Sequence, residues 1–217
     1  MVNYRSLTDV VYEYISDQIS SGKLKPNASI SEAAICKDLE VSRTPVREAL
    51  MQLSIEGYIE RIPRRGFFTR ELTEERVCNI YQIIGNLEAM GAVLAVERRQ
   101  GLDLDGLRDC ARQMDQAIAE RQYAVYNRLQ HRFHEHILQA SGNEDLARLV
   151  INIKKVFMRQ EYIFPITDYD THALFLEMNK EHWQMIQLIE SGDTQALRAL
   201  FCDLHWNVKY AAYHTYV

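Results

Sequence analysis

Residues 41–50 read VSRTPVREAL, and residues 58–69 read YIERIPRRGFFT. From the first stretch onward, apolar residues recur at intervals of three and four, which is the spacing of one face of a helix. These residues are Val46, Ala49, Leu50 and Leu53. Ser42 is a favourable N-cap and Gly57 is a favourable stop, so we expect a helix over residues 43–56.

The second stretch has the pattern of a β-hairpin. Aromatic and β-branched residues occupy 58–62 and 67–69, and Pro63-Arg64-Arg65-Gly66 lies between them. Such residues favour strands, and a segment that runs from proline to glycine favours a turn. The sequence therefore predicts two short strands joined by an arginine-rich tip.

Two further helices are expected upstream, over residues 6–21 and 31–39. The second of these begins after Ser31, which is a favourable N-cap. Three helices followed by a hairpin are the outline of a winged helix-turn-helix, in which the third helix enters the major groove of DNA.

The third helix carries polar side chains on the face opposite its apolar stripe. At about 100° per residue, Thr44 and Arg47 point away from that stripe, and Arg43 lies beside them in the first turn. An arginine on this face can bond guanine O6 and N7 together. The hydroxyls of Ser42 and Thr44 and the N–H groups of the helix N-terminus suit phosphate oxygens. We therefore predict DNA contacts by Ser42, Arg43, Thr44 and Arg47.

The hairpin tip supplies the other predicted contacts. Arg64 and Arg65 can reach phosphates or the minor groove, and Gly66 allows the backbone to turn tightly and approach DNA. Two arginines on a turn can also be merely solvated. Their place downstream of an arginine-bearing helix favours the DNA role.

The rest of the chain has a helical pattern. Breaks at glycine-containing and proline-containing segments separate helices expected over 73–100, 103–121, 123–141, 143–163, 170–190 and 193–213. The fold class is thus mainly α, and we place the domain boundary between residues 72 and 73. Residues 1–72 form the DNA-binding domain, and residues 73–217 form an all-helical domain.

Composition restricts the alternatives. The chain of 217 residues has a net charge of −5, but residues 1–70 hold ten Lys and Arg against nine Asp and Glu. Any surface that meets phosphate must therefore lie in the first third. Four widely spaced cysteines argue against a disulfide framework or a zinc cluster. With no membrane span or signal pattern expected, we predict a cytoplasmic protein.

The stretch around VSRTPVREAL, with Glu56-Gly57 and Arg64-Arg65-Gly66-Phe67 downstream, closely resembles the GntR family of bacterial regulators. The resemblance covers about residues 6–70. It implies that Ser42, Arg43, Thr44, Arg47 and Gly66 contact operator DNA. One departure is Ala33, where some members carry an arginine that touches DNA.

Residues 74–208 resemble the C-terminal domain of the FadR-type branch of that family, the FCD type. The landmarks are Leu87-Glu88, Phe133-His134 and Glu181-His182. The resemblance implies an antiparallel helical bundle that forms a homodimer and binds a small-molecule metabolite. It also implies, for many members, a divalent metal held by one aspartate and three histidines.

The chain departs from that ligand set at two positions. Gln130 occupies the aspartate position, and Leu204 occupies the third histidine position, with His205 next to it. A regular helix would turn Leu204 inward and rotate His205 by about 100°, so His205 can point inward only if the helix register slips or a bulge intervenes. His134 and His182 alone are a poor site for zinc or nickel, so we disfavour a bound metal and expect two buried histidines. The expected effector-binding residues are Gln130, His134, His182 and Leu204.

The effector is expected to be less acidic or more hydrophobic than usual, because Ile84 occupies a position where family members often carry an arginine. Candidate lining residues are Leu87, Tyr126, Phe133, Phe157, Tyr162 and Trp183.

We interpret the chain as a transcriptional repressor that binds double-stranded, pseudo-palindromic operator DNA as a homodimer and responds to an effector. Two alternatives stay open. One is a constitutive DNA-binding dimer with a vestigial pocket. The other is a metal-dependent enzyme, against which stands the lack of a nucleophile motif, a phosphate loop or a complete ligand set.

Overall fold

The computed structural model describes residues 5–71, 73–158 and 171–210. The chain forms two compact units: the first runs to Thr73 and also takes in the helical residues from Asn152 onward, and the second begins at Glu74. Each unit is described in its own right below.

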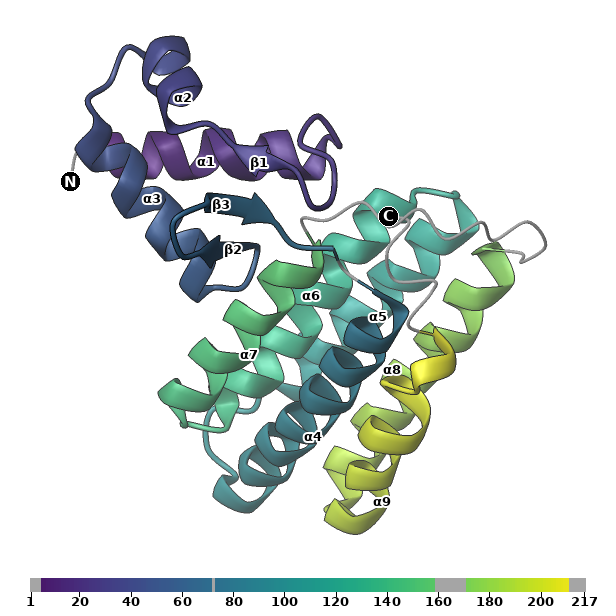
Figure 1. Ribbon diagram of the computed structural model, residues 1–217. Coiled ribbons are helices and arrows are strands. Elements are labelled where there is room, and N and C mark those ends of the chain that lie inside the picture. The colour runs from purple at the N-terminus through teal and green to yellow at the C-terminus, as the bar shows by residue number, and fades with distance from the viewer. Residues whose placement is uncertain (1–4, 72, 159–170, 211–217) are drawn as a thin grey trace. The chain divides into compact units, whose positions relative to one another are not determined.

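The first unit contains three helices and a small sheet (Figure 1). The helices are α1 (Leu7–Ser20), α2 (Glu32–Leu39) and α3 (Arg43–Ile55). The strands are β1 (Ser29–Ile30), β2 (Ile59–Ile62) and β3 (Gly66–Thr69). All strand pairs are antiparallel, and the order β1-β3-β2 places the hairpin's second strand in the middle. The predicted winged helix-turn-helix is confirmed.

The core of this unit lies between α1 and α3, which pack against each other. The apolar stripe of α3 is fully buried, and α1 contributes Val11 and Ile15 to the same core. Strand β1 was not predicted. It has only two residues, and it forms by pairing with Phe67 and Phe68 far along the chain, so no local periodicity indicates it.

The helix caps agree in part with the sequence. The Ser31 side chain accepts a hydrogen bond from the Ala34 N–H, as an N-cap should. Ser42 has the extended backbone of an N-cap, but its side chain makes no capping hydrogen bond. The predicted cap is therefore wrong in its side-chain role, and the Ser42 hydroxyl stays exposed at the start of α3.

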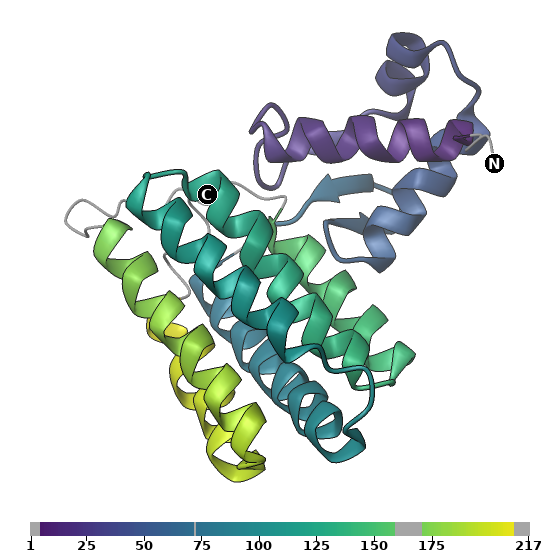
Figure 2. The same ribbon diagram turned by 180° about the vertical axis from the view of Figure 1, so that it is seen from behind.

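The second unit is a bundle of helices (Figures 1 and 2). The helices are α4 (Glu74–Arg98), α5 (Leu104–Ala119), α6 (Tyr123–Ala140), α7 (Glu144–Met158), α8 (Thr171–Ser191) and α9 (Thr194–Ala199). Helix α5 packs between α6 and α8, and α4 packs against α6 and α9. Leu138 of α6 meets Leu146 and Val150 of α7 in a cluster that also includes α4 side chains. Within the described residues, no helix is long and apolar enough to cross a membrane.

The prediction of one regular helix over 193–213 is wrong. After α9, the chain continues as a π-helix over Leu200–His205, and a short 3-10 helix follows over Val208–Tyr210. The Trp206 N–H donates to the Phe201 carbonyl 3.0 Å away, a bond across five residues rather than four. Residues 211–213 of the prediction lie outside the described part of the chain.

Candidate functional site

The solvent face of α3 carries the residues predicted to read DNA. Ser42, Arg43, Thr44 and Arg47 are all exposed, while Pro45 and Val46 between them are buried. Arg47 Nε lies 2.8 Å from Glu32 Oε2 at the start of α2, and 62% of the Arg47 side chain is exposed. The helix therefore presents an N-terminal cluster of cations and hydroxyls above a packed core.

The hairpin tip is a tight turn. Arg65 N–H donates to the Ile62 carbonyl 3.0 Å away, and Arg64 has φ +64°, as the third residue of a type II turn requires. Gly66 follows with φ +99°, a conformation that L residues with a side chain adopt only with strain. The Arg65 guanidinium lies over the Phe68 ring, 5.1 Å from its centroid. The tip thus presents arginines on a backbone that depends on glycine.

A cluster of three buried histidines lies inside the helical unit. His134 comes from α6, His182 from α8 and His205 from the π-helix. His134 Nε2 lies 3.2 Å from His182 Nε2 and 3.0 Å from His205 Nε2. One ligand atom from each ring lies within 4.8 Å of those from the other two. The cluster brings together residues from three separate helical segments.

The π-helix explains why His205 joins this cluster. One extra residue in the turn transfers the inward position from Leu204 to the next residue. His205 is fully buried, whereas Leu204 is 47% exposed. The prediction that Leu204 points inward with the effector-binding residues is therefore wrong, and the ligand set that seemed to lack a third histidine has one. The sequence signal that could have found it is the histidine directly after the expected position.

Each histidine also contacts an oxygen through its other ring nitrogen. Glu88 Oε2 lies 2.9 Å from His134 Nδ1, and Glu181 Oε2 lies 2.8 Å from His205 Nδ1. His182 Nδ1 lies 3.2 Å from Asn179 Oδ1. This amide oxygen is an acceptor, because the Asn179 nitrogen donates to the Ala111 carbonyl and to Asp115. The Nδ1 atoms of His182 and His205 thus face hydrogen-bond acceptors, and that of His134 lies within ion-pair distance of a carboxylate.

The oxygens of Glu88, Asn179 and Glu181 form an outer layer around the histidines. This layer influences which ring nitrogen carries the proton and therefore whether Nε2 can bind a metal. A neutral imidazole that donates from Nδ1 has a lone pair on Nε2. If all three histidines take this tautomer, three lone pairs converge in a buried centre, an arrangement that favours a cation between them. Nitrogens that bind zinc at about 2.0–2.1 Å are about 2.8–3.4 Å apart for angles between 90° and tetrahedral. Two of the three separations, 3.0 and 3.2 Å, fall in this range, and all three ligand atoms lie within 4.8 Å of one another. Small side-chain shifts would therefore let the three rings hold a divalent metal.

Aromatic rings enclose the histidines. The Phe133 ring centroid lies 4.9 Å from that of His182, and the Trp206 centroid lies 6.2 Å from that of His134. Trp206 Nε1 donates to Glu88 Oε2 at 2.7 Å, which connects the ring to the outer layer. Burial raises the pKa of the Tyr126 phenol well above its ordinary value, so this neighbour of His182 stays neutral. Buried aromatic rings therefore enclose the histidines beyond the oxygens that contact their Nδ1 atoms.

The other residues expected near an effector are placed as follows. Gln130 is buried one turn before His134, and Ile84 on α4 is fully buried. Tyr126 and Phe133 are buried, and Leu87 and Trp183 are half-buried. The Phe157 side chain and Tyr162 lie outside the described residues.

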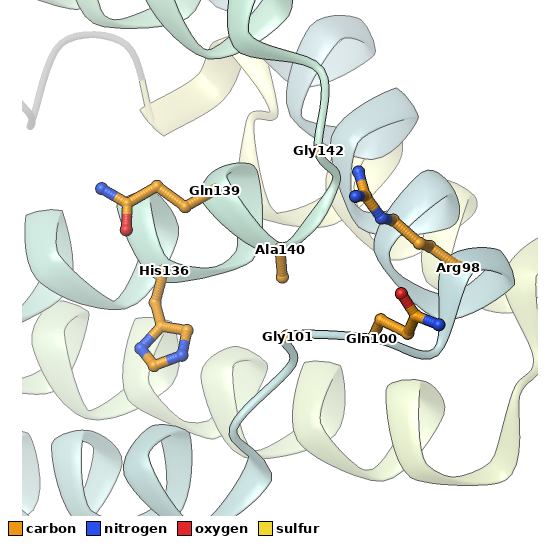
Figure 3. Close-up of a pocket in the computed structure, with 7 residues that line it drawn as sticks. All are labelled: Arg98, Gln100, Gly101, His136, Gln139, Ala140 and Gly142. Atoms are coloured by element: carbon orange, nitrogen blue, oxygen red, sulfur yellow. The ribbon is translucent and has the colours of Figure 1, made fainter.

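A separate pocket of about 290 Å³ lies where α4 and α6 end (Figure 3). Its lining is Arg98, Gln100, Gly101, His136, Gln139, Ala140 and Gly142. Arg98 reaches the Gly142 backbone so closely that a Cβ there would overlap its guanidinium. The lining shares no residue with the histidine cluster, so this pocket does not match the expected effector site.

Comparisons with known proteins agree with these two units. The family described as bacterial regulatory proteins, gntR family, matches residues 7–69, and the FCD domain matches residues 79–204, which is more than half of the chain. This chain belongs to the GntR family and carries an FCD domain. GntR-family proteins of this kind are DNA-binding transcriptional regulators.

Relatives of this GntR-family chain include the Nta operon transcriptional regulator of Aminobacter aminovorans, which is 31% identical over 60% of the chain and 62% of its own length. The uncharacterized regulator YdhC of Bacillus subtilis is 29% identical over 86% of the chain and 82% of its own length. The solved structure of Escherichia coli McbR/YncC is similar in fold, with a TM-score of 0.69 and 24% identity over 98% of this chain and all of that one.

Proposed function

We propose that this GntR-family regulator represses transcription by binding a pseudo-palindromic operator as a homodimer, and that an effector in the helical unit changes its affinity for the operator. Two relatives are named repressors. They are the gluconate operon transcriptional repressor of Bacillus subtilis, 27% identical over 84% of this chain, and a probable D-xylose utilization operon repressor of Paenarthrobacter nicotinovorans, 24% identical over 85%. The observation that carries the proposal is the exposed polar face of α3 beside the arginine-tipped hairpin.

In this proposal, α3 reads bases from its N-terminal turn. Arg43, Thr44 and Arg47 meet base edges in the major groove. The Ser42 hydroxyl, which is not used as a cap, binds a phosphate together with the helix N-terminus. Arg64 and Arg65 contact phosphates or the minor groove, and Gly66 brings the backbone close.

The helical unit offers a face for a second copy. Ile83 and Met90 lie seven residues apart on α4 and therefore on one face, and they are 47% and 44% exposed. Apolar side chains on one stripe of a long helix suit burial against a partner. A dimer built by two-fold symmetry would present two reading helices to two half-sites.

The histidine cluster is the proposed effector site, with a divalent metal such as zinc or nickel held by His134, His182 and His205. A bound metal supplies a positive centre that attracts an oxygen of the effector. Gln130 is neutral where the family resemblance implies an aspartate, so this chain would leave more of the metal's positive charge to the ligand. The part of the effector that does not bind the metal is expected to be apolar, because it would meet Ile84, Tyr126 and Phe133. We therefore propose a metabolite with one metal-binding group and a hydrophobic body.

The experiment is selection of bound duplexes from random DNA by the full-length protein, followed by anisotropy titrations of selected and unselected duplexes at two salt concentrations. We expect a palindromic consensus and a steep salt dependence of the affinity. Failure to prefer any duplex would refute operator recognition. Selected binding that no metabolite alters, in a screen that follows the melting temperature, would support the alternative of a constitutive dimer with a vestigial pocket.

A further inference from the structure

Glu32 and Arg47 form a pair whose geometry bears on base reading. Glu32 is the first residue of α2, and Arg47 lies one turn after Arg43 on the solvent face of α3. The Glu32 carboxylate contacts Arg47 through Nε at 2.8 Å, and 26% of the Glu32 side chain is exposed. A partly buried anion on one helix thus holds a largely exposed cation on the next.

The guanidinium nitrogen that Glu32 contacts determines which N–H donors of Arg47 are left to bind DNA. A guanidinium has five N–H donors, and the Nε contact occupies one of them. Bidentate recognition of guanine O6 and N7 needs two donors in a fixed plane. The Nη1 and Nη2 groups supply these donors at the end of the side chain away from the helix. When Glu32 holds Arg47 through Nε, both terminal nitrogens, Nη1 and Nη2, therefore stay available to bond a guanine.

We propose that Glu32 is a specificity-determining positioning residue, which orients the Arg47 guanidinium so that its two terminal nitrogens face a guanine. This inference rests on the proposed contact between Arg47 and a base. Arginine has many rotamers when unrestrained, and a side chain that is already oriented loses less freedom when it binds.

If Glu32 acted only through its charge, replacing it would have the opposite effect on DNA binding. A carboxylate beside a DNA-binding face repels phosphates, so its removal should tighten binding to every duplex. The positioning role predicts weaker binding to the preferred sequence alone. The sign of the change in the ratio of specific to nonspecific affinity therefore separates the two.

Glu48 provides a matched control. It is the next residue after Arg47 on α3, it is exposed, and its Oε2 accepts a hydrogen bond from Thr8 Oγ1 at 2.8 Å. Glu48→Gln also removes one negative charge, from the helix that carries Arg47, without touching the guanidinium. Glu32 also lies in the first turn of α2, where a negative charge stabilises the helix. A loss of folded protein lowers both affinities equally, so the ratio is unaffected by it.

The experiment measures anisotropy of a duplex selected by the wild-type protein, the same duplex with one guanine replaced in turn, and an unselected duplex. We expect Glu32→Gln to weaken binding to the selected duplex by about tenfold, to leave unselected DNA unchanged or tighter, and to erase discrimination at one guanine. In an Arg47→Ala background, Glu32→Gln should have no further effect on the ratio. Glu48→Gln should preserve the ratio.

Two results separate this inference from the function on which it rests. If Arg47→Ala abolishes discrimination while Glu32→Gln preserves or raises it, Glu32 does not position the guanidinium, and operator recognition stands. If the wild-type protein itself prefers no sequence, the proposed function fails first.

Discussion

His134 Nε2 and His205 Nε2 lie 3.0 Å apart, although 71 residues separate them in the chain. The contact exists because a π-turn precedes His205 and shifts the inward position by one residue. The proposed metal site and the last helix of the bundle are therefore coupled through the backbone register.

Replacing His205 tests this coupling. We expect protein purified without added metal to contain close to one equivalent of zinc or nickel, and His205→Ala to weaken metal binding by more than about 100-fold, since loss of an outer-layer partner alone has an effect of about 10–100-fold. Leu204→Ala, at the exposed neighbour, should retain the metal. Mass spectrometry of metal content and competition with a chelator measure both, and equal metal content in the two variants would refute the assignment.

Glu88 is expected to tune the site through His134. Glu88→Gln removes the negative charge 2.9 Å from His134 Nδ1, so the metal affinity should fall by about 10–100-fold. Glu97→Gln changes an exposed carboxylate on the same helix and should leave the affinity unchanged. The same chelator competition measures both variants. An unaltered affinity in Glu88→Gln would show that this carboxylate has no influence on the ligand.

Two helical glycines of α4 should respond differently to alanine. A Cβ at Gly85 would lie 2.9 Å from Trp206 Cβ and 3.5 Å from the Phe201 carbonyl, neither of which can move independently of the π-helix. We expect Gly85→Ala to lower the free energy of unfolding by about 1–3 kcal/mol and to weaken metal binding. A Cβ at Gly91 meets a Leu138 methyl group at 2.8 Å, which can rotate away.

Gly91→Ala should therefore change stability little, because the gain in helix propensity, about 0.5–1 kcal/mol, offsets the repacking. Denaturant titrations compare the two variants. Equal losses would contradict the view that Trp206 must approach α4 at Gly85.

The wing depends on the backbone of Gly66. No atom lies within 4 Å of a Cβ built there, so Gly66→Ala is opposed only by its φ of +99°, which costs an L residue about 1–2 kcal/mol. We expect the hairpin tip to distort and the affinity for DNA to fall. Gly101→Ala, with φ +82° and equally open surroundings in the helical unit, imposes similar strain and should leave DNA affinity unchanged. Similar DNA affinities in both variants would argue against a wing contact.

Arg65 is expected to contribute a phosphate contact. Arg65→Ala should weaken binding to all duplexes alike and reduce the slope of log K against log salt by about 0.9. Arg112→Ala removes an exposed arginine that pairs with Asp109 on α5 and should leave the slope unchanged. Anisotropy at four salt concentrations measures the slope. A change confined to one DNA sequence would instead assign Arg65 to base reading.

The sequence alone determined those helices, caps and turns that depend on residues close together in the chain. The apolar stripe of α3, the Ser31 cap and the hairpin between Tyr58 and Thr69 follow from periodicity and turn composition, because neighbouring residues decide them. The same holds for the number of helices in the bundle up to α8 and for the exposed polar face of α3.

Only the tertiary structure decided the histidine site. A periodicity of 3.6 residues assumes a regular helix, and it places Leu204 inward and His205 outward. The π-turn reverses this, and the contacts that accompany it come from His134, Glu181 and, through Trp206, Glu88. These partners lie on other helices, so packing between distant segments sets the register that no local pattern contains.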